Sequence, residues 1–233
     1  MRGGTIVIPA WNEAARIEPA VRAATAWLER HGGGQTLVVD DGSSDDTATR
    51  AERLGATVIR FPQNRGKGAA VRAGMLAATG DPVLFCDADL STPIEAWDLL
   101  RARHDAGADV VFGVRTRDSV TVRQALPRIW LGRAGNWLVR ALLSRGVHDT
   151  QCGFKSFRRA AARAVFERVT IERFGFDMEV LVIARRRGLP VDTVPVPWAN
   201  DPRSTVRPIR DACRTLGDVR RIWWNKVRGR YDR

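Results

Sequence analysis

Cysteine is scarce in this chain of 233 residues. Cys86, Cys152 and Cys213 are too few for a disulfide framework and too widely spaced for a zinc site. No apolar run approaches the roughly 18 to 20 residues that a membrane span needs. The first residues lead directly into a short apolar stretch, without the regions of a signal peptide. These absences predict a protein of the reducing cytoplasm, and 233 residues suffice for one α/β domain with or without an appendage.

Lysine is also rare, although the chain is strongly basic. The formal net charge is +12 and the sequence pI about 11.1, and the only lysines are Lys67, Lys155 and Lys226. Arginine therefore supplies nearly all of the positive charge. A charge of this size indicates an anionic partner, which can be nucleic acid, a nucleotide or anionic lipid.

Short apolar segments rich in β-branched residues alternate with segments of helical periodicity. This alternation predicts an α/β fold with a doubly wound, mostly parallel sheet and flanking helices. We expect one domain over residues 1–200 and a basic amphipathic extension over residues 201–233. The expected strands are 5–10, 36–39, 57–59, 83–86, 108–114 and 191–196, and 118–148 is expected to form a loop and a helix.

Two of these strands run directly into paired carboxylates. Asp40 and Asp41 follow one strand, and Asp87 and Asp89 follow another. Each pair can be a helix cap or a polar turn, but two such pairs at the ends of neighbouring strands favour a ligand site. Oxygen ligands of this kind suit hard cations such as Mg²⁺ or Mn²⁺.

Residues 208–233 predict one amphipathic helix, with arginines on the face opposite its apolar residues. Residues 200–233 contain ten basic and four acidic side chains. Such a helix can lie in a membrane interface, with Ile222, Trp223 and Trp224 as the contacts. It can equally pack on its own domain and leave its arginines in water.

Five motifs occur in order along the chain: PAWNE (9–13), VVDDGSSDDT (38–47), NRGKG (64–68), DADLSTP (87–93) and DTQCGFKSF (149–157). Over residues 5 to about 200 this set resembles the inverting family 2 glycosyltransferases of the GT-A (Rossmann-like) fold. It is most similar to the polyprenyl- and dolichyl-phosphate hexose synthases. The later segments GFDMEV (175–180) and WANDPRSTVRPIRDA (198–212) resemble the dolichyl-phosphate β-glucosyltransferase branch.

The resemblance implies roles for individual residues. Asp87 and Asp89 match the DXD element that binds a metal on the donor diphosphate, and Ser91 stands where relatives often carry an amide ligand. Lys67 would meet a phosphate, and catalysis is assigned to Asp89, Asp87 and Lys67. The nucleotide pocket would comprise Pro9, Trp11, Glu13, Asp40, Asp41, Gly66, Lys67, Asp87 and Ala88, and the acceptor phosphate would meet Arg115, Arg117, Arg128, Arg133, Asp149, Gln151 and Lys155.

By this resemblance the chain moves a hexose, glucose first, from a UDP-sugar such as UDP-glucose to polyprenyl phosphate, with Mg²⁺ or Mn²⁺ as cofactor. It would act peripherally on the cytoplasmic face of a membrane with an anionic surface. A lipid phosphate needs no general base, because it is mostly dianionic at neutral pH.

Two alternatives stay open. A sibling enzyme that glycosylates a sugar hydroxyl would need a base, and Asp149 or Asp177 is available. A non-catalytic basic binder of anionic lipid or nucleic acid has no need for paired carboxylates at strand ends. The sequence contains no recognised nucleic-acid module, so nucleic acid is not an expected partner.

Overall fold

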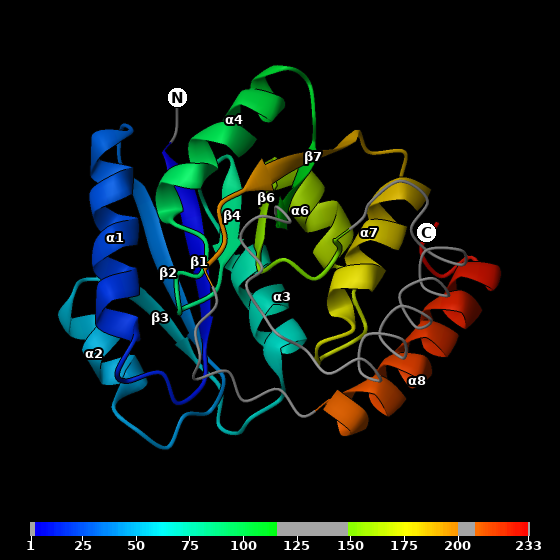
Figure 1. Cartoon of the computed structure of the whole chain (residues 1–233), viewed down its shortest axis with the longest axis horizontal. Helices are drawn as coiled ribbons and strands as arrows, with labels where there is room; N and C mark the ends of the chain where they lie inside the picture. Colours follow the sequence, from blue (N-terminus) through cyan, green and yellow to red (C-terminus); the bar gives the residue numbers. More distant parts are fainter. Residues whose placement is uncertain (1–2, 116–148, 200–207, 233) are drawn as a thin grey trace.

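The computed structural model describes residues 3–115, 149–199 and 208–232, and the side chains of 208–216 lie outside its description. The described residues form a seven-stranded sheet in the order β3-β2-β1-β4-β6-β5-β7 (Figure 1). The strands are β1 Gly4–Ala10, β2 Gly34–Asp40, β3 Thr57–Arg60, β4 Val83–Cys86, β5 Val110–Arg115, β6 Phe154–Phe157 and β7 Val191–Val196.

All neighbouring strands run parallel except β6, which is antiparallel to both β4 and β5. The predicted mostly parallel, doubly wound sheet is therefore confirmed, and its six expected strands are present. The seventh, β6, lies within a motif that the sequence pattern presented as a site loop. The helix expected within residues 118–148 lies outside the described residues.

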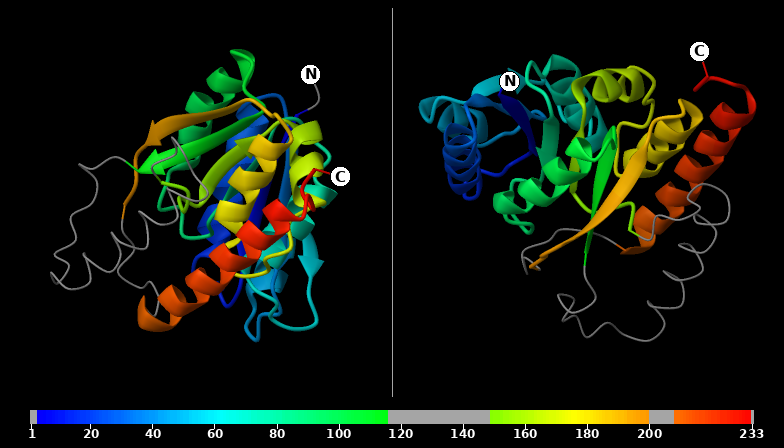
Figure 2. Two further views of the ribbon diagram at one scale, coloured as in Figure 1. Left: turned by 90° about the vertical axis from the view of Figure 1, so that its right-hand side faces the viewer. Right: turned by 90° about the horizontal axis from the view of Figure 1, so that it is seen from above.

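Helices cover both faces of the sheet because successive side chains of a strand point to opposite faces. On β1, Ile6 and Ile8 pack in one core with α1, α2 and α4, whereas Val7 packs in the other with α3, α6, α7 and α8 (Figures 1 and 2). The helices are α1 Ile17–Arg30, α2 Thr47–Arg53, α3 Lys67–Ala77, α4 Trp97–Asp105 after a 3₁₀ turn at Ile94–Ala96, α6 Arg159–Phe166, α7 Phe176–Arg186 and α8 Pro208–Val227.

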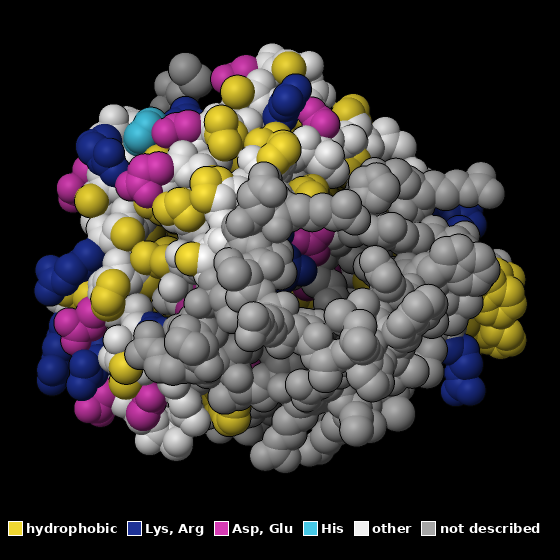
Figure 3. Space-filling model, in the orientation of Figure 1, with side chains coloured by type: hydrophobic (Ala, Val, Ile, Leu, Met, Phe, Trp, Pro, Cys, Tyr) yellow, Lys and Arg dark blue, Asp and Glu magenta, His cyan; other side chains and the backbone are white. Residues whose placement is uncertain are grey.

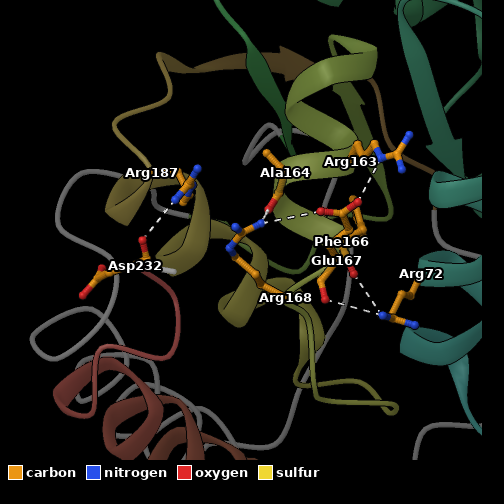
Figure 4. A network of polar contacts seen from close by, with 8 residues as sticks. All are labelled: Arg72, Arg163, Ala164, Phe166, Glu167, Arg168, Arg187 and Asp232. Carbon is orange, nitrogen blue, oxygen red and sulfur yellow. Dashed lines mark hydrogen bonds and ion pairs between the residues drawn. The ribbon is translucent and has the colours of Figure 1, made fainter.

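Arginines connect the helices of the second layer (Figure 4). The Nε of Arg72 on α3 donates to the carbonyl oxygen of Phe166 at 2.9 Å, and thus satisfies a carbonyl that the end of α6 leaves without a partner. Within the end of α6 itself, Arg163 and Glu167, four residues apart, form an ion pair at 2.9 Å. Arg187 donates to the carbonyl oxygen of Asp232 at 3.1 Å and so binds the C-terminal segment to α7.

The C-terminal half of α8 packs on the domain. Val219, Ile222 and Tyr231 are buried, and the Tyr231 hydroxyl donates to Oε1 of Glu179 on α7 at 2.7 Å. The expectation that Ile222 faces outward is wrong, because its side chain is part of the core. Trp223 and Trp224 stay exposed. None of the helices in the described part is both long and apolar enough to cross a membrane.

Candidate active site

The carboxyl ends of β1, β2 and β4 meet where the strand order reverses. β1 lies between β2 and β4, and Ala10 pairs with Asp40 in register. Asp87 follows the last residue of β4 directly. In open α/β sheets this reversal leaves a crevice outside the strand ends, where ligands bind. The two carboxylate pairs predicted from the sequence therefore lie at the same edge of the sheet.

The side chain of Asp87 pairs with a lysine and lies close to Gly153. The Nζ of Lys67, the first residue of α3, lies 2.6 Å from Oδ1 of Asp87. A Cβ atom on Gly153 would overlap Oδ2 of Asp87, so a larger residue there would force this carboxylate to move. Burial opposes the charge of Lys67, but Asp87 and also Asp177 and Asp89 outweigh it and raise the pKa of Lys67. Lys67 is thus a fixed positive charge at the site.

Asp89 faces a small cavity of about 20 Å³ beside this ion pair. Its Oδ1 accepts a hydrogen bond from the backbone N–H of Ser91 at 2.9 Å, and the other carboxylate oxygen has no hydrogen bond among the described residues. The cavity is lined by Asp87, Asp89, Ser91, Thr92, Gly153, Phe154 and Trp198.

These donors fit a hard divalent cation, because two carboxylates and a hydroxyl offer only oxygen ligands. Across residues 3–115, 149–199 and 208–232, no three His, Cys, Asp or Glu side chains form a metal-binding cluster. An ion bound here would therefore take further ligands from water or from the phosphates of a bound molecule.

A second ion pair lies completely buried beneath Asp87. The Nζ of Lys155 on β6 lies 2.6 Å from Oδ1 of Asp177 on α7 and donates to the carbonyl oxygen of Cys152. The ammonium also lies 5.0 Å from the ring centroid of Phe85. Burial raises the pKa of Asp177, although Lys155 and Lys67 oppose this effect. Because Lys155 has no exposed surface, it cannot contact an acceptor in this conformation.

Arg115 and Asp149 form a third pair at the end of β5. The guanidinium binds the carboxylate with two parallel hydrogen bonds of 2.7 and 3.0 Å, and it lies 5.2 Å from the ring centroid of Trp198. Burial opposes ionisation of Asp149, but the hydrogen bonds and charge of Arg115 outweigh it and lower the pKa. Guanidinium carries five N–H groups, and the others of Arg115 have no partner among the described residues, so they can meet an anion.

The predicted nucleotide residues at the end of β1 form a turn. Asn12 adopts a positive φ of 55°, and its Oδ1 accepts from the backbone N–H of Ser44 at 2.9 Å. The backbone N–H of Glu13 donates to Oγ1 of Thr47 at 2.8 Å. This turn projects Trp11 with 52% of its surface exposed, which leaves an aromatic face available for stacking. Pro9 lies within β1, and Ala88 is buried between Asp87 and Asp89.

Asp41 organises the glycine-rich turn. Its carboxylate accepts from the backbone N–H groups of Arg65 and Gly66 at 2.7 and 2.8 Å and from Nδ2 of Asn64 at 2.9 Å. Burial raises the pKa of Asp41 despite these hydrogen bonds. Asp40, also buried, accepts from the N–H of Ser43 at 3.3 Å.

The glycines of this turn lie against another segment of the chain. A Cβ on Gly66 would lie 2.6 Å from the carbonyl oxygen of Glu172, and one on Gly68 would lie 2.5 Å from that of Ile171. The segment 171–173 thus makes the close approach at both glycines, and nothing in the sequence indicated that it packs against this turn. It leads into α7 and Asp177.

The structure brings most of the predicted residues to one edge of the sheet. Gln151 is exposed in the turn before β6. Arg117, Arg128 and Arg133 lie outside the described residues. Gly153 and Trp198 were not predicted to line the site. Gly153 lies within the DTQCGFKSF motif, which was the only signal for it.

Comparison with known proteins gives concordant matches. The family model described as "Glycosyl transferase family 2" matches residues 5–166. A dolichyl-phosphate beta-glucosyltransferase of Drosophila melanogaster is 32% identical over 240 residues, which cover 94% of this chain and 74% of the relative. A dolichyl-phosphate beta-glucosyltransferase of Trichomonas vaginalis is 36% identical over 212 residues, which cover 83% of this chain and 63% of the relative.

Among solved structures, the Mycobacterium tuberculosis glucosyl-3-phosphoglycerate synthase in complex with Mn²⁺, UDP-glucose and phosphoglyceric acid superposes with a TM-score of 0.65. It is 21% identical, and the match covers 96% of this chain and 80% of that one. This likeness confirms the GT-A arrangement of the sheet and its flanking helices.

Proposed function

Because the chain belongs to glycosyl transferase family 2 and is a glycosyltransferase, we propose that it transfers glucose, with inversion, from a UDP-sugar to a polyprenyl phosphate. The names of its relatives support dolichyl phosphate as the class of acceptor. The bound UDP-glucose and Mn²⁺ of the structural neighbour support the donor and the metal. The observation that carries the proposal is the carboxylate pair Asp87 and Asp89, with Lys67 beside it, at the strand-order reversal.

The proposed reaction exchanges one bond for another. An oxygen of the acceptor phosphate forms a bond to the anomeric carbon as the bond from that carbon to the donor β-phosphate oxygen breaks, and UDP leaves with the electron pair. Asp87, Asp89 and Ser91 would hold Mg²⁺ or Mn²⁺ on the donor diphosphate, where the ion supplies positive charge to the leaving group. Lys67 adds a second positive charge on the same side.

A phosphate acceptor fits the ion pairs better than a sugar hydroxyl does. Both carboxylates considered as a general base are bound by cations, Asp149 by Arg115 and Asp177 by Lys155. Arg115 keeps N–H groups with which to hold an acceptor phosphate, and about a third of its side chain is exposed. We therefore favour a reaction without a protein base.

We also propose that the enzyme meets its lipid acceptor at an anionic membrane surface through the C-terminal part of α8. Trp223, Trp224 and Val227 are exposed there, and Arg228 lies 4.5 Å from the ring centroid of Trp224. Hydrophobic side chains lie at the edge of the molecule where α8 ends, with basic side chains beside them (Figure 3). Aromatic and basic side chains together suit the boundary of a lipid bilayer.

The direct test incubates the protein with labelled UDP-glucose, dolichyl phosphate and Mg²⁺ or Mn²⁺, and then extracts the lipid. We expect label in the lipid, and none in excess chelator. Asp89→Asn should reduce transfer by at least about 100-fold with an unchanged melting temperature, whereas the exposed Asp46→Asn should retain activity. Full turnover in excess chelator would contradict the proposed metal requirement. Transfer of label only to sugar hydroxyls would contradict the proposed phosphate acceptor.

A further inference from the structure

A second cavity, of about 870 Å³, opens at the opposite edge of the sheet from Asp87. Gly4 at the start of β1 and Pro82 just before β4 line it, so it lies at the amino ends of the parallel strands. The end of α1 and the start of α6 form two of its walls. We refer to this space as the amino-edge cavity. It shares no lining residue with the cavity beside Asp89.

The amino-edge cavity is rich in arginine. Four arginines line it and only two carboxylates, Asp81 and Asp105. Among the described residues, the guanidinium groups of Arg101 and Arg159 have no carboxylate partner. The four arginines are Arg101, Arg158, Arg159 and Arg163.

The existing contacts position these groups and leave donors unused. Arg158 donates to the carbonyl oxygen of His104 at 3.0 Å and lies 3.7 Å from Asp105. The guanidinium of Arg101 lies 5.4 Å from the ring centroid of Trp27. Arg163 is paired with Glu167 (Figure 4). Since each guanidinium carries five N–H donors, the cavity retains a surplus of positive donors.

The first turn of α6 lies at the same wall. The helix begins at Arg159, and its first turn contains no acidic residue. Asp81 accepts the N–H of Arg159 at 2.8 Å, and Ala160, the next residue, also lines the cavity. A helix N-terminus carries partial positive charge that suits a phosphate group, and at α6 the carboxylate of Asp81 already offsets part of that charge.

Trp27 supplies a rigid aromatic wall of the cavity. It lines the cavity and is 1% exposed. Its ring is fixed by stacking on His31, with centroids 3.9 Å apart, and by contact with Trp97 at 4.4 Å. The cavity therefore combines a preformed apolar wall with its arginines.

We propose that the amino-edge cavity binds a phosphorylated small molecule. The phosphate lies on the side lined by the start of α6, Arg158 and Arg159. The remainder of the ligand lies against the apolar wall of Leu76, Pro82 and Trp27. Such a site is separate from the donor site and goes beyond the proposed transfer reaction.

Calorimetric titration of the full chain tests this proposal at about 0.15 M ionic strength, where long-range charge is screened. Phenyl phosphate and inorganic phosphate are the probes, and chelator suppresses metal-dependent binding at Asp87 and Asp89. We expect saturable binding, tighter for phenyl phosphate because its ring meets the apolar wall. The double variant R101Q/R159Q should weaken binding by about tenfold or more, since it removes the two guanidinium charges of the cavity that have no carboxylate partner among the described residues.

The matched control is R22Q/R53Q, which removes the same charge from exposed arginines outside the cavity. It should weaken binding less than about twofold, because long-range charge alone contributes little. Absence of saturable binding, or an equal loss in both double variants, would overturn the proposal. Glucosyl transfer should be unchanged in R101Q/R159Q, so failure here is distinguishable from failure of the proposed function.

Vesicles containing phosphatidic acid identify the source of the phosphate. If R101Q/R159Q weakens vesicle binding as strongly as phenyl phosphate binding, the ligand is a lipid headgroup. If vesicle binding is unchanged while phenyl phosphate binding falls, the ligand is a soluble phosphate. Either result supports a phosphate site in this cavity.

Discussion

At the scale of single residues, the site is a set of alternating charges. Lys67 pairs with Asp87, Lys155 pairs with Asp177 beneath it, and the charge of Asp177 also acts on Lys67. Burial of an ion pair contributes little net stability, but removal of one partner leaves an uncompensated charge in the core. Lys155 is therefore a positioning residue for the floor of the site, and its loss tests this view.

We expect Lys155→Met to lower the free energy of unfolding by about 3 kcal/mol at neutral pH, measured by urea denaturation. Without the ammonium, the pKa of Asp177 rises further above its ordinary value, because burial is then opposed by Lys67 alone. A carboxyl whose folded pKa is raised contributes stability below that pKa and loses it as pH rises. The loss of unfolding free energy in the variant should therefore be smaller at pH 5 than at pH 7.

The double variant K155M/D177N provides the control for this prediction. It removes both charges, so it should be less destabilised than Lys155→Met and should show little of the pH dependence. A deficit in Lys155→Met that is equal at pH 5 and pH 7 would contradict the assigned role of Asp177.

Sequence and structure agree that the carboxylates of two strand ends meet at one edge of the sheet, and differ on what several other residues do. The carboxylates at two strand ends were predictable, because parallel strands place their carboxyl ends at one edge. The partners of Asp41 and Lys155 were not, since both pairings join segments far apart in the chain. An arginine-rich composition made Lys155 notable in the sequence, but only the packing of β6 against α7 explains its burial.

At the scale of elements, the sequence did not reveal β6, and it located α8 without its packing face. β6 is only four residues, all buried, so neither alternation nor length distinguished it from a loop. In α8, amphipathic periodicity located the helix but could not show which apolar residues face the domain. Asn225 and Tyr231 decide this, because their buried polar atoms reach Thr170 and Glu179.

The docking of α8 can be tested at Tyr231. Glu179 accepts four hydrogen bonds, from the N–H and hydroxyl of Thr170, the N–H of Ile171 and the hydroxyl of Tyr231. Tyr231→Phe removes one donor and should cost about 1–2 kcal/mol of unfolding free energy, with faster amide exchange in α8. The exposed Trp223→Ala should change neither quantity, and equal effects of the two variants would contradict this mode of docking.

At the scale of the whole molecule, the net charge of +12 and the exposed end of α8 act together. A long-range positive field speeds the approach to an anionic leaflet, and exposed tryptophans then hold the protein there. Deleting α8 would be a poor test of this contact, because Ile222 and Tyr231 belong to the core. Substitutions confined to its exposed face separate the two contributions.

We expect the protein to co-sediment with anionic vesicles at low salt and much less with neutral vesicles. Each arginine near an anionic surface contributes about 1 kcal/mol. R220Q/R221Q should therefore weaken binding at low salt and have little effect at high salt, where charges are screened. W223A/W224A should remove the binding that persists at high salt, while the exposed Leu99→Ala on α4 serves as the apolar control. If the wild-type protein does not bind anionic vesicles at low salt, the exposed face of α8 is solvated surface, and the acceptor must be reached by another part of the chain.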